Sequence, residues 1–436
     1  MSAMIESLQD NFSRQPKAPG GEAVHQVRAQ AMKEFLDAGL PGPRDEYWKY
    51  TRLRIIEKRP FGLARKNAVD GSDIGIENLD AIRIVFVDGI YSPTLSAESA
   101  FAENGIRLLA DALRDDPGLA GGLLPQADPA MHQFAALNRA FLGQGVVIEL
   151  AAGQELSRPL YLLFYSQKTG RDTASHPRIL IKAGTDSKAS VIEHYDGAPG
   201  NAGLCNALTE IDLARGAQLT HYRIQTESDT AFHLGSLFAH QAEGSRLVSH
   251  NLSLGARLAR TNMQFELLGR GAELVLNGLY LAGGKQHIDN HTLVNHREPG
   301  ASSFQDYRGI IDDQARAVFC GKAVVHPDAQ QSVAKQINRN LLLSEGAEID
   351  TQPVLEIYAD DVQCSHGATI GRLDPDALFY LFTRGVPEDE ARGLLTFAFA
   401  EDVVLRLENE TLRNALGKHL VGRLPDLENA DELVAT

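Results

Sequence analysis

The chain has 436 residues, more than one hydrophobic core usually supports, so we expect either several domains or one elongated repeat body with appendages. Its 57 acidic residues outnumber the 42 basic ones and give a net charge of -15, which argues against nucleic acid as the main partner. Three scattered cysteines, Cys205, Cys320 and Cys364, are too few for a disulfide framework, and an odd count favours a reducing compartment.

Targeting and catalytic motifs of common types are missing from the sequence. The first residues contain no apolar stretch of signal-peptide length, and no later segment approaches the roughly 18 apolar residues of a membrane span. We therefore expect a cytoplasmic protein that does not associate with membranes. The absence of a P-loop, a Rossmann fingerprint, a nucleophile elbow and a zincin helix motif argues against a self-contained enzyme of a common class.

The first 150 residues predict mixed α/β structure. Residues 1–20 combine polar groups with prolines and glycines, and we expect a disordered tail there. Apolar residues at spacings of three and four predict two helices within residues 22–57, and the only tryptophan, Trp48, is expected to anchor them on the body of the protein. The rest of this predicted domain, residues 21–150, contains a strand from Arg83 and helices at residues 108–113 and 129–142.

Short alternating runs such as PLYLLFY and AELVLNGLYL predict strands over residues 151–372. Glycines followed by small or polar residues and then a strand recur at intervals of 21 to 32 residues, which favours the stacked coils of a β-helix over the alternative, a large β-sandwich. The end coils of a β-helix expose unpaired strand edges, so we expect a protein partner. The recurring glycines are Gly184, Gly216, Gly244, Gly271, Gly300, Gly321 and Gly346.

Helical patterns return after Gly371 and predict a C-terminal helical domain, residues 373–436. Asp374 and Pro375 form a cap and first-turn pair, a second helix begins at Pro387, and a third covers residues 408–419. Amphipathic helices of this kind usually pack on their own domain, and docking of a separate protein is the alternative.

The run HIDNHTLVNH offers His287, Asp289, His291 and His296 as candidate metal ligands. On a strand the first three share a face, whereas His296 points the opposite way unless a bulge intervenes. We therefore weigh a mononuclear metal site against hydrogen-bonded strand histidines, and the parity favours the latter. Cys205 and Cys320 are interpreted as small buried hydrophobes without a function.

Cys364 and His366 lie two positions apart on one predicted strand and therefore face the same way. Thiolate and imidazole are ligands that iron-containing centres favour, although a Cys-x-His pair without context is equally compatible with ordinary core residues. Two ligands do not complete the shell of an iron-sulfur cluster, so a site here needs further ligands from elsewhere.

Three separated motifs carry a resemblance to a known family. They are RDEYWKYT from Arg44, QQSVAKQINRNLLLSEGAEIDTQPVLEIYADDVQCSHGATIG from Gln330, and FYLFTRGV from Phe379. These motifs appear in the same order as in the SufB/SufD family of iron-sulfur cluster assembly proteins. The chain resembles this family from its N-terminal helices to near its C-terminus. It is most similar to the SufD branch, because the segment LLLSEGAEI lacks the scaffold cysteine expected on the SufB strand.

The resemblance implies a right-handed parallel β-helix with helical flanks and a non-catalytic role in a SufBCD scaffold complex. A SufB-like subunit would pair with the β-helix, and a SufC-like ABC ATPase would bind the C-terminal helices. Cys364 and His366 would then contribute interface ligands to a nascent iron-sulfur cluster, with sulfur coming indirectly from a cysteine desulfurase system. Flavin binding by the complex is left open. The alternatives are a SufB-like homo-oligomeric scaffold, in which the partner would be a second copy of this chain, and a β-helical enzyme acting on polysaccharide.

Overall fold

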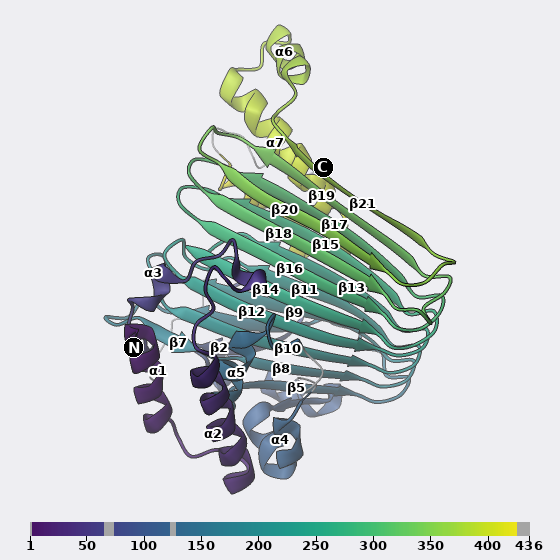
Figure 1. Cartoon of the computed structure of the whole chain (residues 1–436). Helices are drawn as coiled ribbons and strands as arrows, with labels where there is room; N and C mark the ends of the chain where they lie inside the picture. The colour runs from purple at the N-terminus through teal and green to yellow at the C-terminus, as the bar shows by residue number, and fades with distance from the viewer. Residues whose placement is uncertain (1, 65–73, 123–127, 425–436) are drawn as a thin grey trace.

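The computed structural model describes residues 2–64, 74–122 and 128–424 of the chain. Its centre is a parallel β-solenoid of about eight turns, with helices at both ends of the chain (Figure 1). The sequence prediction of a β-helix is therefore confirmed, and the β-sandwich alternative is wrong. Each turn contributes one strand to each of two sheets, because even-numbered strands pair in one sheet and odd-numbered strands in the other from β8 onwards.

Sheet A has 11 strands and sheet B has 10. Sheet A runs β4 (Ile106–Leu108), β5 (Gly145–Leu150), β8 (Arg178–Ala183), β10 (Leu204–Leu213), β12 (Phe232–Gln241), β14 (Leu258–Leu267), β16 (His287–His296), β18 (Arg316–Val325) and β20 (Glu348–Ile357), with β1 (Gly62–Leu63) and β7 (Thr173–Ser175) beside it. Sheet B runs β3 (Ile90–Tyr91), β2 (Ile82–Val87), β6 (Leu160–Ser166), β9 (Lys188–Gly197), β11 (Gln218–Gln225), β13 (Arg246–Ser253), β15 (Glu273–Ala282), β17 (Ser302–Ile311), β19 (Val333–Leu342) and β21 (Gln363–Gly371).

The two sheets enclose the main core. Parallel strands in register stack identical positions of successive coils, so alternate residues of every strand point into one continuous apolar interior. β2 and β5 belong to this body although they precede residue 151, where the sequence analysis placed the start of the β-helix. The solenoid therefore begins earlier in the chain than the composition change indicated.

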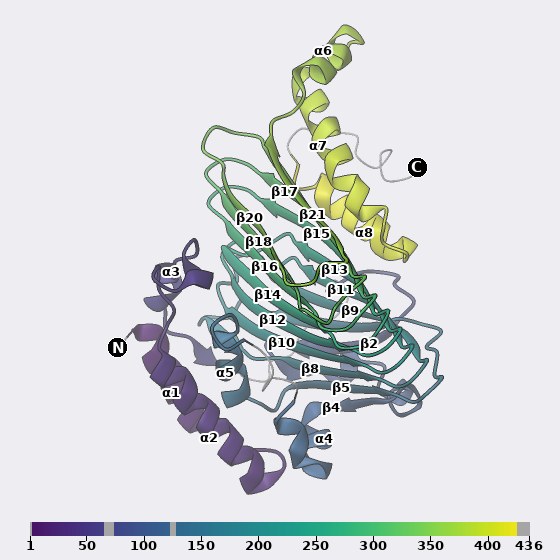
Figure 2. The ribbon, with the colours of Figure 1, turned by 45° about the vertical axis from the view of Figure 1, so that its right-hand side comes forward.

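Helices cover the outer faces of the two sheets on opposite sides of the body (Figure 2). The N-terminal elements lie over sheet A, and α7 and α8 pack on sheet B. The bounds of all described helices are α1 (Ala3–Arg14), α2 (Gly21–Ala38), η1 (Glu46–Trp48), α3 (Arg54–Glu57), α4 (Leu109–Asp115), α5 (Gln133–Ala140), α6 (Pro375–Thr383), α7 (Glu388–Val404) and α8 (Glu410–Val421), with further short turns η2 (Pro93–Leu95), η3 (Glu98–Ala100), η4 (Ala102–Asn104) and η5 (Pro117–Ala120).

The expectation of a disordered tail at residues 1–20 is wrong, because α1 is a packed helix. Ser2 caps it by accepting a hydrogen bond from the backbone N–H of Ile5 at 3.3 Å. Met4 and Leu8 are fully buried, and the side chain of Asn11 donates to the carbonyl oxygen of Phe61 at 2.9 Å. The segment has too little apolar surface to fold alone, but the neighbouring α3 and β1 supply the surface that buries its one apolar stripe.

Trp48 anchors the N-terminal layer on sheet A, as the sequence predicted. Its side chain is 1% exposed, and its ring lies 3.9 Å from the guanidinium carbon of Arg260 and 5.5 Å from the ring of Phe134. A guanidinium over an indole face is the strongest common cation–π arrangement, and here both partners are withdrawn from water. This contact fixes η1 against the outer face of β14.

Candidate functional site

Cys364 and His366 lie on β21, the last strand of sheet B. In the register of β21 with β19, Cys364 neighbours Ala334 and His366 neighbours Gln336, and both neighbours are buried residues of the inner face. Side chains at matched positions of in-register parallel strands point the same way. Cys364 and His366 therefore share the inner face, as the strand parity predicted.

The pair faces the interior of the solenoid but is not sealed within it. β20 and β21 are the outermost strands of sheets A and B, and in the part of the chain that the structure describes no further coil pairs with them. Cys364 is therefore half-buried, against the cluster of Val325, Ala329 and Ala359, while His366 is exposed. Burial raises the pKa of the Cys364 thiol, although a backbone hydrogen bond involving Ala334 opposes the shift. A metal binding there would have to displace this proton.

We call the last coil, β20 and β21, the open end of the solenoid. On β20 the inner-face positions continue the apolar rows of β18, since Ile349 neighbours the fully buried Ala317, and Ile357 neighbours Val325. Ile357 is 43% exposed and Ile370 on β21 is 52% exposed. The open end thus combines two unpaired strand edges, exposed apolar side chains and the Cys364–His366 pair. The apolar side chains are unfavourable in contact with water, and the edges are free to pair with another strand.

The structure does not build a metal site from the HIDNHTLVNH run. His287, Asp289 and His291 lie on the outer face of β16, while His296 points inward, with its Nε2 2.8 Å from Ser303 Oγ. The buried carboxylate of Asp289 is paired with Arg260, accepts a 2.5 Å hydrogen bond from Thr51, and lies 3.0 Å from His291 Nε2. Hydrogen-bonded strand histidines, the favoured alternative, are therefore confirmed.

Cys320 lies on β18 beside His291. Burial raises the pKa of its thiol to about 11, and the negative charge of Asp289 adds to the shift. The thiol is thus protonated at neutral pH and is a poor nucleophile and metal ligand as it stands.

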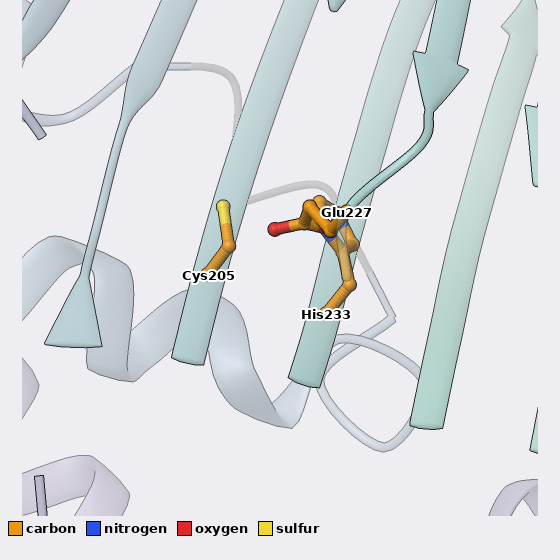
Figure 3. Close-up of side chains that lie close together, drawn as sticks. All are labelled: Cys205, Glu227 and His233. Carbon is orange, nitrogen blue, oxygen red and sulfur yellow. The ribbon is translucent and has the colours of Figure 1, made fainter. Parts of the chain in front are cut away.

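Cys205, His233 and Glu227 form an inner-face cluster that the sequence analysis missed (Figure 3). Cys205 on β10 and His233 on β12 are in-register neighbours, and Glu227 reaches them from the turn before β12. One ligand-type atom from each lies within 4.8 Å of the others. The separation of Cys205 and His233 by one coil in the sequence is the signal that could have indicated this contact.

Arg223 joins this cluster and completes a hydrogen-bond network within it. Its guanidinium contacts Nε2 of His233, while Nδ1 of His233 lies 2.7 Å from Glu227 Oε2, so the neutral imidazole links arginine and carboxylate. Gln225 also donates to Glu227, at 3.1 Å. Because Arg223 already supplies the positive charge that balances Glu227, we assign the cluster a structural role, and Cys205 remains without a function.

Comparison with known proteins gives the family. The model of the SUF system FeS cluster assembly SufBD core domain matches residues 164–399, and that of the SufBD protein N-terminal region matches residues 8–162. Among curated proteins, SufD of Escherichia coli is 32% identical over 404 residues, which cover 91% of this chain and 92% of that protein. The chain belongs to the SufBD family. The resemblance seen in the sequence motifs is thereby confirmed.

Other SufBD relatives match over similar lengths. An iron-sulfur cluster assembly SufBD family protein of Synechocystis is 32% identical over 86% of both chains, and the chloroplastic protein ABCI7 of Arabidopsis thaliana is 27% identical over 97% of this chain and 90% of that protein. The chain is thus an iron-sulfur cluster assembly protein and a homologue of SufD. These matches give no support to the alternative of an enzyme acting on polysaccharide. None of the described helices is long and apolar enough to cross a membrane.

Proposed function

We propose that this chain is the SufD-type, non-catalytic subunit of a SufBCD scaffold complex that builds iron-sulfur clusters, which are its cargo. The observation that carries the proposal is the position of Cys364 and His366 on the uncovered inner face of the last coil. A soft ligand pair at a free sheet edge belongs to a site that a second chain completes.

Ligand number supports a shared site. Iron-sulfur clusters are commonly held by four cysteine or histidine ligands, and Cys364 and His366 offer two. A SufB-like subunit that docks on the open end would pair its strands with the edges of β20 and β21, cover Ile357 and Ile370, and supply the missing thiolates. A cluster would then form between the chains, and neither chain alone would hold it.

α6 offers the surface that we propose for a SufC-like ABC ATPase. This helix projects beyond the solenoid body, whereas α7 and α8 pack on sheet B (Figures 1 and 2). Three aromatic side chains of α6 are exposed: Phe379 by 67%, Tyr380 by 57% and Phe382 by 38%. Exposed aromatic residues gathered on one short helix are typical of binding hot spots.

Movement of the docked ATPases would strain the shared β interface and expose the ligands to iron and sulfur.

Co-purification from native lysate tests this assignment. A tagged chain should retain both a SufB-like subunit and an ABC-type ATPase. Phe379→Asp should weaken ATPase binding at least tenfold while the SufB-like subunit stays bound, because a charge at a buried aromatic contact costs about 2 kcal/mol or more.

Leu268→Asp is the matched control, since Leu268 is 42% exposed at a turn between β14 and β15 and lies on the solenoid body. It should retain both partners. Capture of another copy of this chain without a SufB-like subunit would instead support the homo-oligomeric alternative. Equal ATPase binding by wild type and Phe379→Asp would contradict the role of α6.

A further inference from the structure

A cleft of about 280 Å³ lies on sheet A, whereas the open-end ligand pair lies on sheet B. Its floor is formed where β14, β16 and β18 begin, because Leu258, His287 and Arg316 are in-register neighbours. Its wall is the segment between η1 and α3, which lies over these strand starts (Figure 1). The lining residues are Lys49, Tyr50, Arg52, Ile55, Arg257, Leu258, His287 and Arg316.

The lining is basic although the whole chain carries a net charge of -15. Arg316 has acidic partners, since its Nε donates to Asp350 Oδ2 at 3.1 Å. Within the described ranges, Lys49, Arg52 and Arg257 form no ion pair, and Lys49 lies over the ring of Tyr50 at 4.9 Å. Three uncompensated cations thus converge on one concavity.

Arg257 is the most informative of the three, because it is partly withdrawn from water. Burial lowers the pKa of its guanidinium, and no carboxylate offsets this effect. A desolvated cation without a counter-charge raises the free energy of the folded state. An anion bound in the cleft would recover that free energy by supplying the missing counter-charge. Arg52 and Lys49 cannot supply it, because both are themselves positively charged.

Hydrogen bonds hold the cleft in shape without a ligand. Thr51 bridges its wall to its floor, as the hydroxyl lies 2.7 Å from His287 Nε2 and donates to Asp289 Oδ2 at 2.5 Å. His287 is neutral at pH 7, since burial lowers its pKa to about 4. Trp48, which precedes Lys49, is fixed on Arg260. A preformed site of this kind binds with little loss of conformational entropy.

We propose that this cleft binds a small anion that carries a phosphate or diphosphate group. Arginine guanidinium groups donate paired hydrogen bonds that match phosphate oxygens, and two of the three uncompensated cations are arginines. The volume lies just below the range that is usual for small-molecule sites, so the cleft fits a small ligand. Tyr50, Ile55 and Leu258 supply an apolar side for the carbon part of such a molecule. The inference does not rest on the role of the open end in cluster assembly.

Calorimetric titration of the full chain with sodium pyrophosphate at low ionic strength tests the proposal. Saturable binding is expected, and raising the salt concentration should weaken it. Arg257→Gln and Arg52→Gln should each weaken binding at least tenfold. Arg215→Gln removes the same charge from an exposed turn that follows β10, whereas the cleft lies where strands of this sheet begin. This variant should bind pyrophosphate like the wild type.

Circular dichroism verifies folding of each variant, and Arg52, which is exposed, keeps the test valid if Arg257→Gln does not fold. The proposal is overturned by the absence of saturable heat with pyrophosphate, or by equal affinity of wild type and Arg52→Gln. Binding of citrate as tightly as pyrophosphate would also overturn it, because the site would then recognise any polyanion.

Discussion

His366→Ala is expected to abolish iron-sulfur cluster formation by the assembled complex while leaving the fold and the subunit contacts intact. His366 is exposed on the last coil and packs on no described core cluster, so its removal creates no cavity. It does remove one of the two ligands that this chain would offer. The measurement is anaerobic reconstitution of the purified complex with iron and a sulfur donor, followed by the visible absorbance of the cluster.

His25→Ala is the matched control, because His25 is an exposed histidine on α2. It should assemble clusters at the wild-type level. The proposed ligand role would fail if His366→Ala also assembled clusters at that level in a complex of unchanged composition.

Asp289→Ala should lower the free energy of unfolding by about 3–5 kcal/mol, the cost of leaving a buried charge without its partner. The side chains of Asp289 and Arg260 are 0% and 1% exposed, so Arg260 would lose its counter-charge inside the protein. Thr51 would lose its acceptor as well. Because Arg260 holds Trp48, the damage should extend to the N-terminal layer.

Acid should have a similar effect on the wild type. Although burial opposes it, the charge of Arg260 lowers the pKa of Asp289 below its ordinary value. A carboxylate whose folded pKa is lowered stabilises the protein above its unfolded pKa and loses this contribution as the pH falls. The destabilisation caused by Asp289→Ala is measured by urea unfolding at neutral pH, with Asp328→Ala, at an exposed aspartate, as the control. A change in midpoint no larger than that of Asp328→Ala would contradict the account.

The solenoid could be predicted from the sequence because its cause is periodic. Glycine spacing and strand alternation repeat with every coil, so each coil is independent evidence for the same architecture. Strand parity likewise predicted that His296 faces away from His287, Asp289 and His291. A contact that occurs only once in the structure leaves no periodic pattern in the sequence. The burial of α1 is such a case, because it depends on surfaces supplied by α3 and β1.

The candidate site was predictable in part for the same reason. The common face of Cys364 and His366 follows from their spacing on a strand, but their place on the last coil depends on where the solenoid stops. The Cys205 cluster was missed because Glu227 enters it from a turn, where strand parity does not apply. The basic cleft was missed because its wall and floor are more than 200 residues apart in the sequence, and only tertiary packing brings them together.

The central claim is that the open end is an interface completed by a second chain, and hydrogen–deuterium exchange tests it most directly. In the isolated chain, the backbone amides of Glu348–Ile357 and Gln363–Gly371 that point away from β18 and β19 should exchange rapidly, because no described strand pairs with them. These amides should become protected when a SufB-like subunit is added. Strands in the middle of the solenoid, such as β12, should exchange slowly in both states. Stable binding of that subunit with no added protection of β20 and β21 would contradict the account.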